Sequence, residues 1–412
     1  MRTRLPRRRF CSITALLLLV ALGLTLPLLC WVQDAHLAEK DLAFAQGLYR
    51  QQNYQLAADK FVEFVNKYPN HANMSLAAFR AGECLFRLGR YQEAIGYLEQ
   101  VVQRFPDSAE AESAWCWLGD ACFKAEQYQK AVDAYEALLE KFPNTQQAGR
   151  AAYWLGESYH HLGQHEKAIE AYRTSLAKSP EGDEAPYAAY ALGWTYLQIG
   201  QPQEAVQHLQ HVLTKHAQSS VAAECQYLLG VARQDLGDYE AAIGEFQKVI
   251  VAYGNTPFAP RAQLGIGWCH FHRKDYNKAR DAFGQVRTKH PNSPEVAEAQ
   301  LRLADCDFFL ERWEQAAEGY ARIAEDTNGR FAPEALYWLA VTRERQGQAE
   351  QALATHNQLL TQFPQSPRVA DSYLHIGQLQ AAAGNTEAAV SAFESAAARA
   401  TTDEQKQRAQ KA

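Results

Sequence analysis

The sequence repeats a pattern about every 37 residues, and this periodicity constrains the fold more than any other feature. Tyr128 marks one copy, and the equivalent positions are Tyr54, Tyr91, His165, Pro202, Tyr239, Tyr276, Trp313, Ala349 and Thr386. Every spacing is 37 residues except the 36 between Trp313 and Ala349. Ten copies in register predict a chain of stacked units of similar structure, each too small to bury its own apolar face.

Each unit contains two segments with helical periodicity. In the copy from Trp115 to Pro143, apolar or small residues recur at spacings of three and four on both sides of a short polar connection. An alanine stands three residues after every mark, and a large side chain usually follows four residues later. A proline often ends the unit, because it cannot continue a helix. The sequence shows no sustained alternation of period two, so an all-α fold is predicted.

The pattern W-x2-LG-x2-Y…A-x3-F…P resembles the tetratricopeptide repeat (TPR), whose usual period is 34 residues. The resemblance implies a right-handed superhelical solenoid of about ten helix pairs. The longer period and the FPDS- and FPNT-like turns are similar to those of bacterial cell-envelope members. Examples are the outer-membrane assembly lipoprotein and the periplasmic coordinator associated with Tol–Pal, at the level of the repeat only.

In the resembled family the first helix of each unit lines a concave groove that holds peptides. The resemblance therefore implies a partner-binding stripe of aromatic residues: Trp117, Tyr153, Trp154, Tyr190, Trp194, Tyr227, Trp268, Tyr337 and Trp338. Aromatic side chains offer a large contact area at a low entropic cost. The alternative is that several of them pack between neighbouring helices as core. The lysine and asparagine with which some family members grip a C-terminal carboxylate are replaced by Cys116 and Asp120 in the third unit.

The N-terminal region differs from the repeats. Residues 1–9 carry five arginines and no acid, and residues 10–32 contain no charge and are rich in leucine. That length can cross a hydrocarbon core of roughly 30 Å as a helix. An uncleaved signal anchor, a cleaved signal peptide and lipidation on Cys30 all remain open. Each would place the repeats on the periplasmic side, because the arginines keep the N-terminus in the cytoplasm. An arginine pair before Phe10 also matches a twin-arginine signal, but basic runs give that match easily.

The expected organisation is a basic and apolar segment over 1–37, an array over 38–403 and a polar C-terminal cap over 404–412. Three joints marked by proline and glycine, near residues 180, 255 and 328, are expected to be loops and not domain boundaries. Asp107-Ser108 and Asn144-Thr145 follow closing prolines and are expected to cap helix N-termini.

The array has an acidic charge balance. The whole chain carries a formal net charge of −6, and leaving out the five N-terminal arginines gives −11 for residues 10–412. Phosphate backbones are bound by lysine and arginine, so nucleic acid is excluded as a partner.

The sequence offers little that could support catalysis, and no cofactor is expected. Histidines cluster at His160-His161 with His165, at His208 and His211, and at His270 and His272 beside Cys269. None completes a ligand set at a convincing spacing, so exposed or edge-packed histidines are expected, and no metal. Cys84, Cys269 and Cys306 hold the same position in their units. Stacked helices are too far apart for a disulfide there, and buried thiols are expected.

These features predict a non-enzymatic scaffold that binds other proteins or extended peptides. It would be exported, or anchored in the membrane through its N-terminal segment, with a role in envelope assembly or cell division. The alternative is a carbohydrate- or peptidoglycan-binding module, because aromatic grooves also stack on sugar rings.

Overall fold

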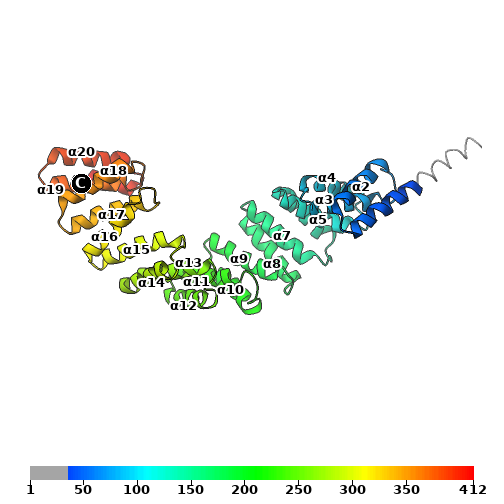
Figure 1. Ribbon diagram of the computed structural model, residues 1–412, viewed down its shortest axis with the longest axis horizontal. Coiled ribbons are helices and arrows are strands. Elements are labelled where there is room, and N and C mark those ends of the chain that lie inside the picture. The colour runs from blue at the N-terminus through cyan, green and yellow to red at the C-terminus, as the bar shows by residue number, and fades with distance from the viewer. Residues whose placement is uncertain (1–35) are drawn as a thin grey trace, which may run out of the picture. The chain divides into compact units, whose positions relative to one another are not determined.

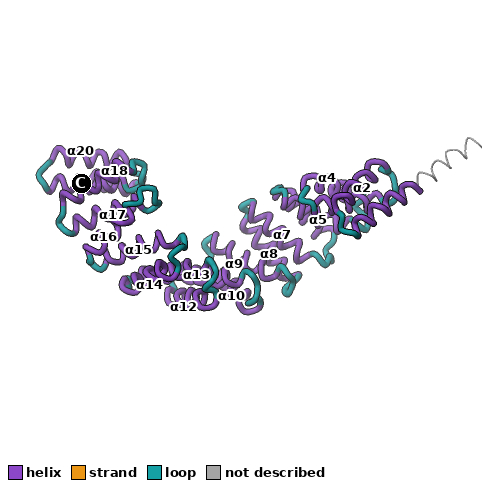
Figure 2. Tube along the Cα trace, viewed as in Figure 1, coloured by secondary structure: helices purple, strands orange, loops and turns teal. Residues whose placement is uncertain are grey.

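The computed structural model describes residues 36–412 and contains helices, turns and loops over that range, with no strand. The described helices form two compact units, one up to Thr195 and one from Tyr196 onward. The boundary falls inside a helix, at none of the three joints marked by proline and glycine. Figure 1 and Figure 2 show antiparallel helix pairs following one another within each unit.

The helices alternate between the first and second member of a pair. The first unit contains a helix over 36–50, α2 (Tyr54–Lys67), α3 (Met74–Arg87), α4 (Tyr91–Arg104), α5 (Ala111–Lys124), α6 (Tyr128–Lys141), α7 (Ala148–His161), α8 (His165–Lys178) and most of α9 (Ala185–Gln198).

The unit from Tyr196 onward continues the same alternation and ends in one extra helix. It contains α10 (Pro202–Lys215), α11 (Ala222–Asp235), α12 (Tyr239–Ala252), α13 (Phe258–His272), α14 (Tyr276–Lys289), α15 (Glu295–Phe309), α16 (Trp313–Ala324), α17 (Ala332–Arg345), α18 (Ala349–Gln362), α19 (Val369–Ala382), α20 (Thr386–Arg399) and α21 (Asp403–Lys411). These helix pairs confirm the all-α repeat fold that the sequence predicts.

The mark of each sequence repeat is the first residue of a second helix, from Tyr54 in α2 to Thr386 in α20. The alanine three residues later is buried in every unit. These alanines are Ala57, Ala94, Ala131, Ala168, Ala205, Ala242, Ala279, Ala316, Ala352 and Ala389. A residue without a long side chain lets the two helices of a pair approach closely, so the predicted register is confirmed.

In several units a glycine on the first helix faces the large residue seven positions after the mark. A Cβ added at Gly119 would lie 2.5 Å from the ring of Tyr135, and one added at Gly156 would lie 2.5 Å from the ring of Tyr172. The ring therefore occupies the space that a side chain on the first helix would fill. This contact sets the distance between the two helices of a pair.

The connection within each pair has one residue in the left-handed conformation, always two positions before the mark. Glycine holds this place in six units, for example Gly163 with φ +70°. In the other four units the residue is Gln52, Glu126, Lys274 or Glu311, each with φ near +60°. The polar connection expected before Tyr128 is thus a helix C-terminal turn with a defined backbone requirement.

Two expectations about helix starts are wrong. Helix α5 begins at Ala111 and α7 at Ala148, several residues after the Asp-Ser and Asn-Thr pairs that were expected to cap them. These pairs belong to the preceding turn, where the Thr145 hydroxyl accepts a 3.1 Å hydrogen bond from the amide of Gln147. The three joints expected to be loops are loops only in part, because Pro186, Pro260 and Pro333 lie inside α9, α13 and α17. Pro333 stands in the first turn of α17, where its missing amide proton costs nothing.

No helix within residues 36–412 combines the length and the apolar character needed to cross a membrane. The predicted membrane segment over 10–32 lies outside the described residues, as do Cys11 and Cys30. The predicted division into segment, array and cap stays a prediction.

Candidate functional site

A pocket of about 450 Å³ opens between three successive first helices, α3, α5 and α7. Neighbouring first helices contact each other here, α3 with α5 and α5 with α7. Its lining combines five aromatic residues with five polar ones: Phe86, Trp117, Phe123, Tyr135, Trp154, Cys116, Asp120, Lys124, Gln147 and Arg150. The whole pocket belongs to the unit that ends at Thr195.

The aromatic walls are two copies of one contact between neighbouring repeats. Phe86 near the end of α3 meets Trp117 in the middle of α5, with ring centroids 4.9 Å apart and the planes at 74°. Phe123 of α5 meets Trp154 of α7 in the same way, at 4.9 Å and 64°. Edge-to-face contacts of this kind add to the energy of burial. Each tryptophan is therefore held by packing while part of its surface remains accessible.

A network of polar groups centred on Asp120 forms the inner end of the pocket. Arg150 lies 2.6 Å from one oxygen of Asp120, and the hydroxyl of Tyr135 donates a 2.6 Å hydrogen bond to the other. Arg150 also contacts the sulfur of Cys116 at 3.0 Å. The carboxylate is thus fully engaged, and the network fixes the side chains that shape the pocket.

The cysteine in this network is a neutral thiol. Burial raises the pKa of Cys116 to about 12. Its sulfur donates a 2.8 Å hydrogen bond to Gln147 at the N-terminus of α7. A nucleophilic cysteine needs a lowered pKa, so this group is not activated for attack.

The rim carries a cation that has no ionic partner in the described part of the chain. Lys124 is exposed, its Nζ lies 5.9 Å from the ring centroid of Trp154, and within residues 36–412 it forms no ion pair. Arg87 lies 5.5 Å from the ring centroid of Trp117, but it is paired with Glu83 at 2.8 Å. Lys124 is therefore the cation best placed to meet an acidic group on a ligand.

Of the nine aromatic residues implied by the resemblance, the pocket brings Trp117 and Trp154 together. Tyr153 contacts its neighbour Trp154 and also Tyr172 and Tyr187. Tyr190 is half-buried, and Trp194 is the most accessible of the nine, with 37% of its surface exposed.

The other four lie in the unit from Tyr196 onward and are held by several contacts. Tyr227 packs on Phe246 and Phe258, and the indole of Trp268 donates a 3.2 Å hydrogen bond to Glu298. Tyr337 is buried. Its neighbour Trp338 donates a 2.9 Å hydrogen bond to Glu334 and packs against Phe308. Several of the nine aromatic residues are thus packed against neighbours and partly accessible at the same time. The role of the set in partner binding stays a prediction.

Sequence reasoning missed half of the pocket. Phe86 and Phe123 each stand 31 residues before the tryptophan that they contact, and that repeated spacing was the available signal. Nothing in the sequence around Arg150 and Lys124 marks them as pocket residues, because lysine and arginine are common on helix surfaces.

The three histidine clusters noted in the sequence do not gather three ligand atoms anywhere in the described part of the chain. His161 stacks on Tyr128 with ring centroids 4.3 Å apart, and His272 stacks on Tyr239 at 5.6 Å. The six cysteines within residues 36–412 are all free and buried, as expected.

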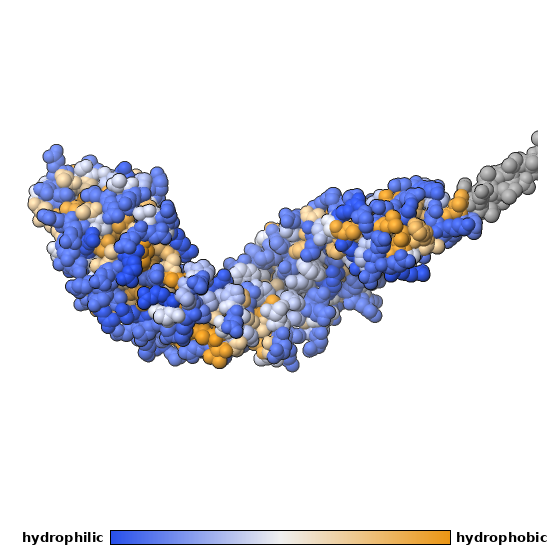
Figure 3. Space-filling view, viewed as in Figure 1, coloured by the Kyte–Doolittle hydropathy of each residue, from blue (hydrophilic) through white to orange (hydrophobic). Residues whose placement is uncertain are grey.

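The face of the protein seen in Figure 3 is mostly hydrophilic. In Figure 3 apolar residues reach the visible face of each unit only in small patches. The pocket has two partly accessible tryptophans, and large apolar side chains gathered at a surface often mark a binding site.

Comparison with one solved structure supports the repeat fold. The C-terminal part of a TPR repeat-containing protein from Cytophaga hutchinsonii aligns with a TM-score of 0.50 and 16% identity, over 62% of this chain and 98% of that chain. The apo form of RapI gives a TM-score of 0.49 and 14% identity, over 79% and 97%. A MamA fragment from Desulfovibrio magneticus RS-1 gives 0.38 and 23%, over 44% and 97%. No curated protein matches the sequence.

Models of the tetratricopeptide repeat family match most of the described chain. One matches residues 42–109, 110–145, 118–183 and 227–294, a second matches 331–402 and a third matches 159–230. The resemblance to the two cell-envelope proteins stays a prediction, since none of these matches concerns them. The first model alone spans about half of the sequence, and with the helix pairs and their register it places this chain in the tetratricopeptide repeat family.

Proposed function

We propose that this protein is a scaffold that binds other proteins and has no catalytic activity of its own. The pocket between α3, α5 and α7 is the proposed contact site, and the observation that carries the proposal is the pair of accessible tryptophans at its walls. An extended segment of a partner would place an apolar side chain between Trp117 and Trp154. Tryptophan is among the residues that contribute most to the energy of protein interfaces.

The charge at the rim indicates which segment fits best. Lys124 lies beside Trp154 without an acidic partner in the described residues. Inside the pocket, the charges of Arg150 and Asp120 offset each other. The proposed ligand is therefore a peptide segment with an aromatic or aliphatic residue next to an acidic one. Its carboxylate would pair with Lys124, and its apolar side chain would fill the pocket.

The proposed location is the periplasmic side of a bacterial inner membrane, with the protein anchored there or released after signal cleavage. Five arginines followed by 23 uncharged residues support an export signal or anchor. A scaffold in that place would bring cell-envelope proteins together, for example during assembly or cell division.

The test uses the full-length protein with a photo-crosslinking residue in place of Lys124, expressed in its own cells. A matched variant carries the crosslinker in place of Lys141. Both lysines are exposed final residues of neighbouring helices, α5 and α6, but Lys141 does not line the pocket. Crosslinks to a protein that form at position 124 and not at 141 would support the proposal.

A charge reversal then tests the chemistry of the ligand. Lys124→Glu should reduce capture of that crosslinked protein by about tenfold, while Lys141→Glu should leave capture unchanged. If Lys124→Glu stays folded and captures the partner as the parent does, the rim cation has no role. Retention of the parent on peptidoglycan, lost in Lys124→Glu, would instead favour the carbohydrate-binding alternative.

A further inference from the structure

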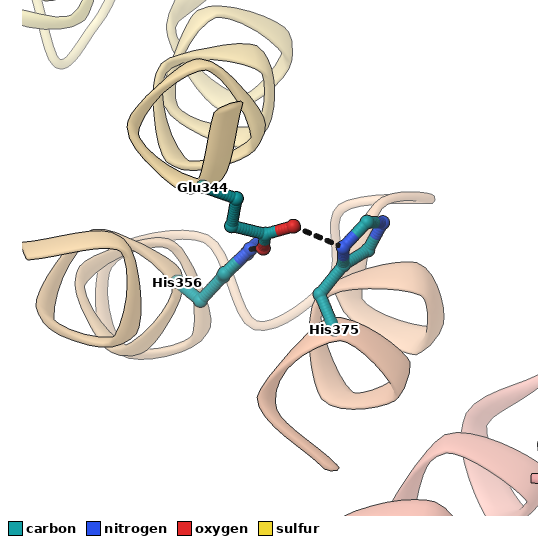
Figure 4. A group of neighbouring side chains, drawn as sticks. All are labelled: Glu344, His356 and His375. Carbon is teal, nitrogen blue, oxygen red and sulfur yellow. Dashed lines mark hydrogen bonds and ion pairs between the residues drawn. The ribbon is translucent and has the colours of Figure 1, made fainter. Parts of the chain in front are cut away.

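Glu344, His356 and His375 meet in the unit from Tyr196 onward, although they come from three different helices. Figure 4 shows the carboxylate of Glu344 in α17 between the rings of His356 in α18 and His375 in α19. One oxygen lies 3.0 Å from Nε2 of His356, and the other lies 3.0 Å from Nδ1 of His375. The two rings stack with centroids 5.4 Å apart.

His356 is buried because of its place in the repeat. It stands seven residues after the mark Ala349, where other units have a buried core residue such as Tyr135, Phe246 or Phe283. A polar ring at a core position is costly unless its nitrogens have partners. Nε2 faces Glu344, but Nδ1 has no hydrogen-bond partner among residues 36–412. An apolar side chain could be buried at this position at a lower free-energy cost. The histidine is therefore better explained by a function of its imidazole ring than by packing.

We propose that Glu344, His356 and His375 form a binding site for one divalent transition-metal ion of the zinc class. Two imidazole nitrogens and one carboxylate are a ligand set that proteins use for zinc, with water or a further ligand in the fourth position. In a tetrahedral site with bonds of about 2.1 Å, neighbouring ligand atoms lie about 3.4 Å apart. The three ligand atoms here lie within 4.8 Å of one another, so small side-chain rotations bring them to a common centre.

The surroundings fit a metal site in two further ways. The hydroxyl of Tyr337 lies 3.3 Å from Nε2 of His375, so it can accept a hydrogen bond from that nitrogen when Nδ1 binds the ion. Such outer partners orient histidine ligands in metal sites. His375 and Glu344 are about one-fifth exposed, so an ion and a water molecule can reach them from solvent.

Hard cations such as Mg²⁺ prefer sites made entirely of oxygen, so the two imidazoles select against them.

The experiment measures metal binding by the full-length protein, purified without a histidine tag and stripped with a chelator. Zn²⁺ is titrated by calorimetry, and Co²⁺ is titrated by visible absorption, which reports coordination by nitrogen and oxygen ligands. One equivalent of Zn²⁺ should bind, and Mg²⁺ should not compete. His375→Gln and Glu344→Gln should each weaken Zn²⁺ binding by at least tenfold, because each removes one of three ligands.

These two positions are chosen because their partial exposure lets the variants fold, whereas His356 belongs to the core. The control is His211→Gln, which removes an exposed histidine on α10 and should bind Zn²⁺ as the parent does. Helical circular dichroism without metal should be the same in all four proteins. If the parent binds Zn²⁺ no more tightly than His375→Gln does, the three side chains form a hydrogen-bonded cluster and no metal site.

Discussion

The hydroxyl of Tyr135 donates a 2.6 Å hydrogen bond to Asp120 and so joins the second helix of a repeat to the first. The same bond recurs between Tyr172 and Glu157 at 2.6 Å, and between Tyr320 and Asp305 at 2.7 Å. In each case the tyrosine stands seven residues after the mark, and the acid stands 15 residues before the tyrosine. A buried tyrosine is tolerated at this core position because the first helix supplies an acceptor.

Tyr135→Phe should therefore lower the stability of the protein by about 1–2 kcal/mol, the range for losing a hydrogen bond to a charged group. Asp120 keeps its contact with Arg150, which limits the loss. Thermal unfolding followed by circular dichroism measures the change. Tyr128→Phe is the control, because its hydroxyl forms no hydrogen bond within residues 36–412. Equal shifts in the two variants would contradict the role of the bond.

The close approach of Gly119 to Tyr135 gives a second prediction. A Cβ at position 119 would lie 2.5 Å from the tyrosine ring, so Gly119→Ala should cost about 1–3 kcal/mol through overpacking. Gly96 is also inside a helix, but a Cβ there would meet nothing within 4 Å. Gly96→Ala should instead stabilise the protein by about 0.5–1 kcal/mol, because alanine is the better helix former. Opposite signs in paired melting curves are expected, and the same sign would refute the assigned contact.

The left-handed turn position predicts a stabilising substitution. Lys274 has φ +63°, a conformation that costs a residue with a side chain about 1–2 kcal/mol, whereas Gly163 holds the equivalent place without that cost. Lys274→Gly should raise the melting temperature, by less than the full strain because glycine also gains freedom in the unfolded chain. Gly163→Ala should lower it. A lower melting temperature for Lys274→Gly would show that the lysine side chain contributes more than the strain costs.

Much of the fold could be predicted from the sequence, because the same residue pattern recurs at the same positions in every repeat. Ten marks identified the first residue of ten second helices, and ten alanines identified the buried crossings. The helix starts after the prolines were misplaced. A polar pair such as Asn144-Thr145 serves a turn as well as a cap, and only backbone geometry separates the two.

The sites were harder to predict than the fold. Trp117 and Trp154 stand out as tryptophans on first helices, but Phe86 and Phe123 become part of a pocket only when neighbouring repeats stack. Glu344, His356 and His375 come from three helices and lie 12 and 19 residues apart along the chain. Metal-ligand patterns read from a sequence depend on short spacings, so this cluster shows no pattern.

The pH dependence of stability should depend in part on Glu83, a buried carboxylate of α3. Burial pushes its pKa upward, but hydrogen bonds from Tyr49, Arg87 and Arg80 outweigh that effect, and the pKa lies below the usual 4.5. A lowered pKa in the folded state contributes stability above the unfolded pKa, and this contribution is lost as the pH falls through the folded value.

Glu83→Gln should therefore destabilise the protein by about 1.5–3 kcal/mol at pH 7, as expected for lost charged hydrogen bonds. The difference from the parent should shrink as the pH falls below about 4.5, because the parent's carboxylate then gains a proton as well. Glu63→Gln is the control, since within residues 36–412 Glu63 forms only an exposed pair with Lys60. A difference for Glu83→Gln that stays constant from pH 7 to pH 3 would contradict this assignment.

The proposed location gives the last prediction. A fluorescent reporter that matures only in the cytoplasm, fused after Ala412, should be dark, and an enzyme reporter active only outside the cytoplasm should be active. The reason is that the arginines of residues 1–9 hold the N-terminus inside, while the uncharged stretch over 10–32 carries the repeats across the membrane. Deleting residues 1–32 should reverse both signals without changing the repeats. A bright cytoplasmic signal from the full-length fusion would contradict export. If export holds, the mass of the mature protein distinguishes a retained anchor from a cleaved signal, because only cleavage removes the first residues.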